Sequence, residues 1–136
     1  PAVPPGQKTT ATVATKARAD HAWNDTTQLT NTINFRYGGI TWNAHRIHYD
    51  GDYTRSEEGY PAIVSNGGLS MHLMVDAALK RAKGRLTGYT ARLVHPLWVG
   101  DLIDVRGEAQ KDGKLKIWAA DKNGVLCGEM DLEFAA

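Results

Sequence analysis

The segment 35–50, FRYGGITWNAHRIHYD, contains a histidine suited to proton transfer and an asparagine that could assist it. Histidine is the side chain that takes up and returns protons near neutral pH, and His48 follows Asn43 by five residues. The amide of Asn43 offers both a donor and an acceptor, so it could hold a water molecule or orient the imidazole. We therefore predict acid–base chemistry at His48, with Asn43 beside it.

A backbone amide at Gly67 is a second candidate for chemistry. Apolar residues recur over 69–83 and cover most of a helix circumference, which predicts a buried helix. Ser65 or Asn66 could cap its start, and Gly84 supplies a stop. Gly67 would then lie where unpaired N–H groups and the positive end of the helix dipole converge, so its amide could bind a developing oxyanion.

The remaining pattern predicts strands around that helix. We expect strands over 28–37, 87–94, 102–109, 115–121 and 125–134. Asp112-Gly113 and Asn123-Gly124 favour tight hairpins, so the last three strands should form an antiparallel meander. Between them, 41–60 has no clear period, and such irregular stretches are often functional. The order is that of an α+β hot-dog fold, in which a curled antiparallel sheet wraps one long helix, and several other α+β folds share it.

Composition narrows the class of protein. The length suits one domain, expected over 21–136, after a flexible tail or linker over 1–20 that holds three of the five prolines. The 16 basic and 15 acidic residues nearly cancel, which disfavours a nucleic-acid partner. A single cysteine allows no intrachain disulfide, and no apolar run approaches the about 20 residues that span a bilayer. We expect a soluble, cytoplasmic protein.

Three segments together resemble the MaoC-like family of (R)-specific enoyl-thioester hydratases and dehydratases. Asn43 and His48 match a signature in which a carboxylate or amide precedes a histidine by five residues, and the run is most similar to that of mesaconyl-CoA and methylfumaryl-CoA hydratases. GYPAIVSNGGL (59–69) resembles the segment leading into the central helix, with Asn66 where histidine is usual. HPLWVGDLIDV (95–105) resembles a Pro-x-x-x-Gly-Asp turn. The resemblance covers about 29–134.

The resemblance implies that water is added to or removed from the 2,3 double bond of an enoyl thioester. His48 would be the acid and base, Asn43 would position water, and the Gly67 N–H would bind the thioester oxygen. The broader signature has Asp at position 43, so His48 would carry the proton alone. CoA or acyl carrier protein would enter as part of the substrate, with no metal or redox cofactor, and two such units would pair in a homodimer or higher oligomer. The residues expected to bind substrate are Ser65, Asn66, Arg46, Tyr49, Trp42 and Tyr37.

Several of these residues have ordinary explanations as well. Arg46 could bind a substrate carboxylate or CoA phosphate, or form a surface ion pair. The aromatic residues could line an acyl tunnel, or fill a core or dimer seam. His45 and His48 with Asp50 could suggest a metal pair, but no further ligand cluster is visible, so we predict no metal.

Two other functions fit the same fold. A thioesterase would need a carboxylate near the helix to direct water at the carbonyl carbon, and Asp76 or Glu57 could serve. A non-catalytic partner subunit of a heteromeric hydratase is suggested by Asn43 and Asn66, which stand where Asp and His are usual. The presence of His48 favours the hydratase.

Overall fold

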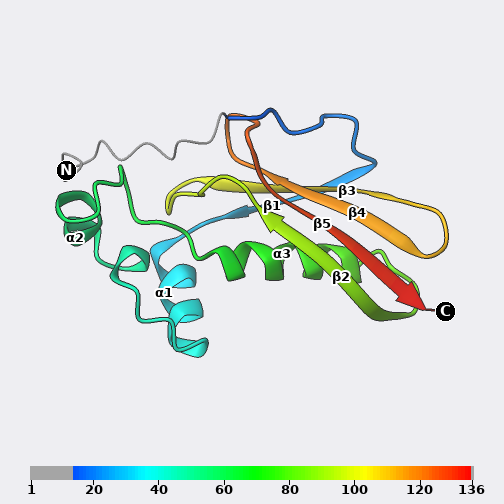
Figure 1. The fold of residues 1–136 in the computed structure, drawn as a ribbon, viewed down its shortest axis with the longest axis horizontal. Coiled ribbons are helices and arrows are strands. Elements are labelled where there is room, and N and C mark those ends of the chain that lie inside the picture. Colours follow the sequence, from blue (N-terminus) through cyan, green and yellow to red (C-terminus); the bar gives the residue numbers. More distant parts are fainter. Residues whose placement is uncertain (1–13, 136) are drawn as a thin grey trace.

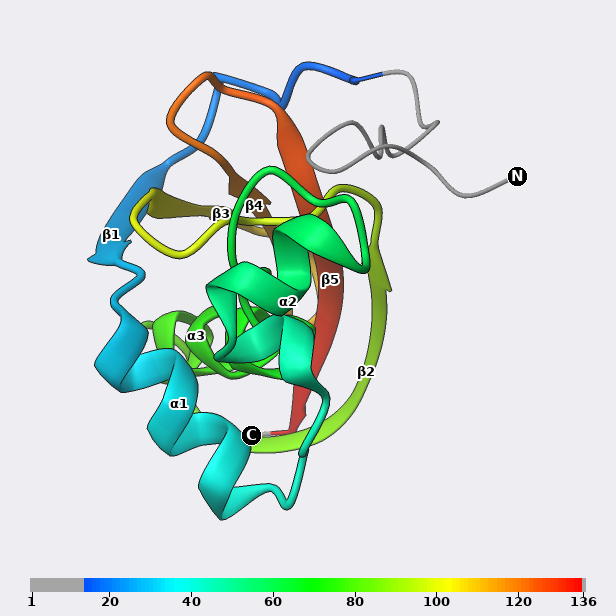
Figure 2. The same ribbon diagram turned by 90° about the vertical axis from the view of Figure 1, so that its left-hand side faces the viewer.

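The computed structural model describes residues 14–135, and its centre is one curled antiparallel sheet around a helix (Figure 1). The strands lie in the order β1-β3-β4-β5-β2. Helix α3 (Gly67–Leu79) lies against the concave face, and the sheet bends around it (Figure 2). The predicted α+β hot-dog architecture is confirmed. The strands are β1 (Trp23–Gln28), β2 (Arg85–Leu93), β3 (Leu102–Ala109), β4 (Lys114–Ala120) and β5 (Leu126–Ala135).

The two predicted hairpins are present and join β3 to β4 and β4 to β5. Asp112 and Gly113 both have positive φ, at 59° and 72°, which is the backbone that a tight primed turn requires. In the second hairpin Gly124 has φ 75°, and the Asp121 carboxylate accepts from the N–H groups of Asn123 and Val125. These turns fix the register of the last three strands.

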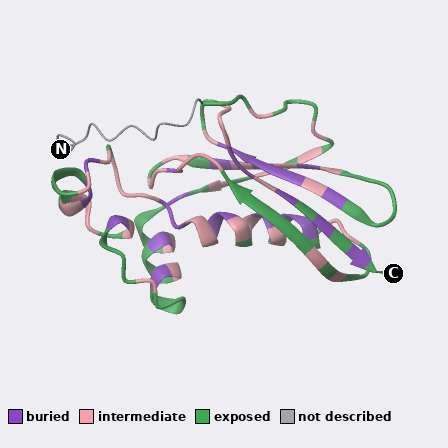
Figure 3. Ribbon diagram, viewed as in Figure 1, coloured by how far each residue is buried: buried purple, intermediate pink, exposed green. Residues whose placement is uncertain are grey.

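The core lies between α3 and the concave face of the sheet (Figure 3). Met74 and Ala78 of α3 are fully buried, as are Ile103, Ile117 and Leu132 of the sheet. The helix starts where Asn66 accepts from the Gly68 N–H, and it ends at residue 79, four residues before the predicted end. Burial of these side chains removes apolar surface from water and holds the amino end of α3 at a fixed place.

The strand predicted over 28–37 is wrong. Residues Asn31–Ile40 form a helix, α1, and the Thr30 hydroxyl caps it by accepting from the Ile33 N–H. The helical turn places Asn34 and Gly38 on the buried side and leaves Phe35 64% exposed. A strand would have put Phe35 on the same face as Ile33. The first strand is instead β1, which pairs with β3.

The irregular segment predicted over 41–60 contains two short helices. These are the 3-10 helix η1 (Arg46–His48) and α2 (Gly51–Ser56), whose first turn is capped by the Asp50 carboxylate. Together with α1 they form a helical layer near the amino end of α3 (Figures 1 and 2). This layer carries the candidate catalytic side chains.

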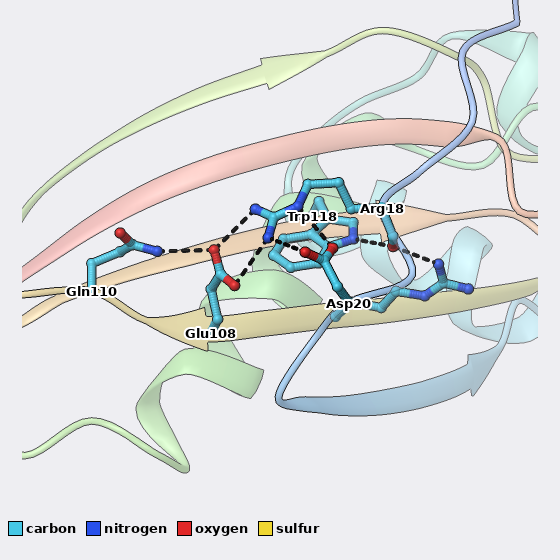
Figure 4. A network of polar contacts seen from close by, with 6 residues as sticks. Arg18, Asp20, Glu108, Gln110 and Trp118 are labelled. Atoms are coloured by element: carbon cyan, nitrogen blue, oxygen red, sulfur yellow. Dashed lines mark hydrogen bonds and ion pairs between the residues drawn. The ribbon is translucent and has the colours of Figure 1, made fainter.

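The expected tail 1–20 lies partly outside the described residues, since only 14–20 of it are placed. Lys16 pairs with Val125, and the Arg18 guanidinium bonds Glu108 at 2.9 Å and lies 4.8 Å from the ring centre of Trp118 (Figure 4). The Trp118 indole N–H donates to the Arg18 carbonyl at 3.0 Å. The segment therefore contacts the sheet on the side away from α3. Among residues 14–135, no helix is long and apolar enough to cross a membrane.

Candidate active site

His48 is held by a hydrogen bond that determines which ring nitrogen carries a proton. It is the last residue of η1, and its Nδ1 lies 2.8 Å from the Val64 carbonyl oxygen. A carbonyl oxygen can only accept, so Nδ1 must donate. In the neutral ring Nε2 is then the nitrogen with a free lone pair, ready to accept a proton.

His48 lines two pockets. The first, which we call the aromatic pocket, has a volume of about 250 Å³ and the second, the helix-end pocket, about 290 Å³. The aromatic pocket is lined by Asn34, Phe35, Gly38, Gly39, Trp42, Asn43, Ala44, His48 and Tyr49. The helix-end pocket is lined by His48 and by residues around the start of α3, at the end of β2 and just after it, and in β4 and β5. These are Val64, Ser65, Gly67, Ser70, Leu93, Val94, His95, Pro96, Leu97, Ala119, Cys127 and Gly128. The two pockets therefore share His48.

Asn43 lies in the aromatic pocket and not in the helix-end pocket. Its N–H donates to the Gly38 carbonyl at 2.9 Å, and its Oδ1 accepts from the His45 N–H at 3.2 Å. Asn43 therefore lines the same pocket as His48, and among residues 14–135 no hydrogen bond joins its side chain to the His48 ring. Trp42 and Tyr49 also line this pocket, and Trp42 is 93% exposed with φ at 55°.

Gly67 lies in the helix-end pocket as the first residue of α3. Among the described residues no acceptor is found for its N–H, as expected for a first-turn amide. A Cβ at this position would lie 2.6 Å from Leu93 Cδ1. Glycine therefore allows the edge of β2 to approach the helix end, and its free amide remains available to an oxygen in the pocket.

Ser65 and Asn66 are each 5% exposed and stand just before α3. Ser65 lines the helix-end pocket, whereas Asn66 lines neither pocket and caps the helix. Ser65 Oγ and Asn66 Nδ2 are buried without a partner among residues 14–135, and so is Nδ1 of His95, another lining residue of the helix-end pocket. Buried polar atoms in native proteins are usually paired, so this corner has unused hydrogen-bonding capacity.

Arg46 and Tyr37 are not brought to either pocket. Arg46 donates to Asp50 at 2.6 Å and lies 4.2 Å from the Tyr53 ring centre, and the hydrogen bond to Asp50 raises the pKa of Arg46. Tyr37 forms a hydrogen bond of 2.7 Å with His72 on α3, and burial raises the pKa of Tyr37. Both residues therefore have structural partners in place of the expected substrate contact.

His45 packs edge-on against His48 with ring centres 5.9 Å apart. Its Nε2 lies 3.9 Å from a carboxylate oxygen of Glu58, while its backbone N–H donates to Asn43 Oδ1. Within residues 14–135 no group of three or more His, Cys, Asp or Glu side chains could hold a metal ion. His45, His48 and Asp50 therefore do not form such a group in the described part of the chain.

Asn34 is the residue at this site that the sequence interpretation missed. It is fully buried on α1 and lines the aromatic pocket beneath His48. Its side chain makes hydrogen bonds to the backbone of His48, Val64 and Asn66. If 31–40 is interpreted as a helix, Asn34 and Gly38 lie on one inward face. The feature of the sequence that indicates this helix is Thr30, a residue type favoured at the N-cap.

The model of one family, hydroxyacyl-thioester dehydratase type 2, matches residues 3–99. The chain belongs to this family. The matched range contains Asn43, His48 and Gly67. It also contains the other lining residues of the two pockets, except Ala119, Cys127 and Gly128. MaoC-like hot-dog hydratases and dehydratases are thus its relatives, in agreement with the resemblance in the sequence.

Relatives of the family extend well beyond this chain. The mesaconyl-C(4)-CoA hydratase of Chloroflexus aurantiacus is 39% identical over 79 residues, which cover 58% of this chain and 28% of that protein. The mitochondrial hydroxyacyl-thioester dehydratase type 2 of Schizosaccharomyces pombe is 29% identical over 97 residues, or 69% of this chain and 32% of that protein. The chain therefore spans about a third or less of the length of these curated relatives.

The fold is also found in solved structures. A MaoC-like dehydratase from Phytophthora capsici superimposes with a TM-score of 0.78 at 18% identity, covering 95% of this chain and 45% of that one. At this identity the likeness concerns the fold. This chain therefore matches less than half of that longer protein.

Proposed function

We propose that this chain adds water to, or removes it from, the 2,3 double bond of an enoyl thioester, with His48 as both base and acid. The observation that supports this most directly is the bond from His48 Nδ1 to the Val64 carbonyl. It leaves Nε2 as the acceptor of a ring that borders both pockets. Membership of the dehydratase family supports the reaction class.

The proposed hydration starts with water held near Asn43 in the aromatic pocket. His48 Nε2 takes a proton from this water as its oxygen bonds to C3. The electron pair of the double bond moves toward the thioester, where the Gly67 N–H and the α3 dipole stabilise the enolate oxygen. The imidazolium, still donating from Nδ1 to Val64, then returns its proton to C2. Dehydration is the reverse, and neither direction changes the net proton count.

Acyl-CoA is the substrate class we propose. The name of the Chloroflexus relative includes a CoA thioester, and the helix-end pocket offers an apolar wall from Leu93, Leu97 and Ala119 for a short acyl group. Arg46 is engaged with Asp50, so it does not support recognition of an acyl carboxylate.

Pairing with a second hot-dog unit is part of the proposal. Strand β2 lies at the edge of the sheet, with Tyr89 and Leu93 exposed (Figure 3). An unpaired edge with apolar side chains favours pairing with another strand. The second unit could be a copy of this chain or another domain, and light scattering of the purified chain distinguishes a dimer from a monomer. Cytoplasmic localisation stays a prediction, because one relative is described as mitochondrial.

The thioesterase alternative has less support from the geometry. Asp76 bonds Lys80 at 2.8 Å, and Glu57 lies in a surface hollow with Arg46. Neither carboxylate lines a pocket that contains His48. A non-catalytic role remains as an outcome of the assay below.

The deciding assay follows the enoyl-thioester absorbance with crotonyl-CoA and mesaconyl-CoA, with a thiol reagent in parallel. The wild type should remove the band without releasing free thiol. His48→Ala should abolish the change, Asn43→Ala should slow it by about 10²-fold, and His72→Ala, a histidine outside both pockets, should keep it. Thiol release would favour a thioesterase, and an inert wild type would favour a partner subunit.

A further inference from the structure

One buried side chain connects the three backbone segments that form this site. Asn34 on α1 is 0% exposed. Its Nδ2 donates to the carbonyl oxygens of His48 at 2.7 Å and Val64 at 3.2 Å, and its Oδ1 accepts from the Asn66 N–H at 2.8 Å. Both amide protons and one oxygen lone pair are used, so the amide has little freedom to turn.

The orientation of this amide follows from its partners. A flipped Asn34 would place its oxygen against two carbonyl oxygens, and its NH₂ group against an N–H donor. All three contacts would become repulsive. The side chain is therefore fixed in the direction that donates toward His48 and Val64 and accepts from Asn66.

The Val64 carbonyl is where this network meets the chemistry. It accepts from Asn34 Nδ2 and also from His48 Nδ1, which fills both of its lone pairs. The direction of that carbonyl decides that the ring proton sits on Nδ1. Asn66 is the cap of α3, so the third bond of Asn34 holds the residue just before the free Gly67 amide.

We propose that Asn34 is a positioning residue that fixes the His48 tautomer and the spacing between His48 and the amino end of α3. Only the expected effect of Asn34 on the reaction rate rests on the proposed function. Asn34 touches no reacting atom. It acts by holding the carbonyl that orients the base and the cap that presents the oxyanion donor.

The test reads the tautomer directly, from nitrogen-15 spectra of the histidine rings with His48 assigned by its loss in His48→Ala. The wild type should show a protonated Nδ1 and a bare Nε2. Asn34→Asp is matched in size and keeps the acceptor for Asn66, but loses the NH₂ donor, and Asn34→Ala loses all three bonds. Both should mix the two tautomers, whereas Asn31→Ala, an exposed asparagine on the same helix, should not.

Kinetics give the second readout. Both Asn34 variants should lower kcat by about 10- to 100-fold with KM changed by less than about 3-fold, because a misplaced base weakens the transition state more than binding. Folded variants that keep the wild-type tautomer and kcat overturn the proposal and leave the hydratase intact. If no thioester is turned over, the proposed function fails, and the tautomer comparison still decides the role of Asn34. Should neither variant fold, a wild-type ring protonated on Nε2 overturns the proposal.

Discussion

The single thiol of the chain allows a quantitative test of burial beside the proposed site. Cys127 is 2% exposed and lines the helix-end pocket. Burial, with a smaller contribution from the charge of Asp121, raises its pKa from 9.0 to about 12. Three pKa units lower the thiolate fraction at about pH 8 by about 10³-fold, and the thiolate is the reactive species.

Alkylation with iodoacetamide measures this fraction. The native protein should react at least about 10³-fold more slowly than the denatured chain at about pH 8, and its rate should keep rising with pH beyond about 10. The denatured chain should level off once the pH exceeds the ordinary thiol value. Because the sequence has one cysteine, every adduct reports this site. A native rate within tenfold of the denatured rate would refute the buried thiol and the enclosed wall of the pocket.

The same shift predicts a change in stability. When folding raises the pKa of a group, the group makes its full contribution to the unfolding free energy below its pKa in the unfolded chain. That contribution is lost as the pH rises toward the pKa in the folded protein. At about pH 10.5 the wild type should therefore lose about 2 kcal/mol of unfolding free energy relative to neutral pH through Cys127 alone. Urea denaturation of the wild type and Cys127→Ala at both pH values isolates this contribution, and equal losses in the two proteins would contradict it.

Two further substitutions follow from contacts in the structure. Gly67→Ala would bring a methyl group 2.6 Å from the end of Leu93, a flexible side chain on an edge strand, so thermal unfolding should show a small change in Tm while kcat/KM falls about tenfold or more. The Arg81 guanidinium lowers the pKa of Asp25, so the pair stabilises the fold above the ordinary carboxyl range and this contribution is lost as pH falls through the lowered value. Asp25→Asn should cost about 1 kcal/mol at neutral pH and nothing in strong acid, by urea denaturation.

The elements that the sequence predicted correctly are those whose local and tertiary signals agree. The helix at α3 is apolar on most of its surface because the sheet wraps it, so its burial is visible in the pattern. The last three strands are marked by turn residues that supply positive φ at Asp112, Gly113 and Gly124. Both signals depend on a few neighbouring residues.

The error at 28–37 has a tertiary cause. Alternation of apolar and polar residues fits a strand, but the segment forms α1, where Asn34 is satisfied by backbone groups of η1 and of the chain before α3. No local pattern reveals partners 14 and 32 residues away. β1 was missed because it is a short, polar edge strand, with residues alternating between intermediate burial and full exposure.

For the candidate site, residue types indicated which side chains could do chemistry but not how they are arranged. His48, Asn43 and Gly67 were expected to act on one substrate, and in the structure Asn43 lines the aromatic pocket, Gly67 lines the helix-end pocket and His48 lines both. Arg46 was expected to face a ligand, and the nearby Asp50 and Tyr53 engage it instead. The direction of such a side chain depends on the partners that the fold brings near it, and the spacing of residues in the sequence does not specify those partners.

A residue that lines two cavities, as His48 does, has a consequence for the order of events in the proposed reaction. Water can reach His48 from the side of Asn43 while the acyl group occupies the side of Gly67. Neither reactant then blocks the route of the other, so exchange of the water needs no departure of the thioester. The oxygen of a bound 3-hydroxyacyl group should consequently exchange with labelled solvent faster than the free product appears.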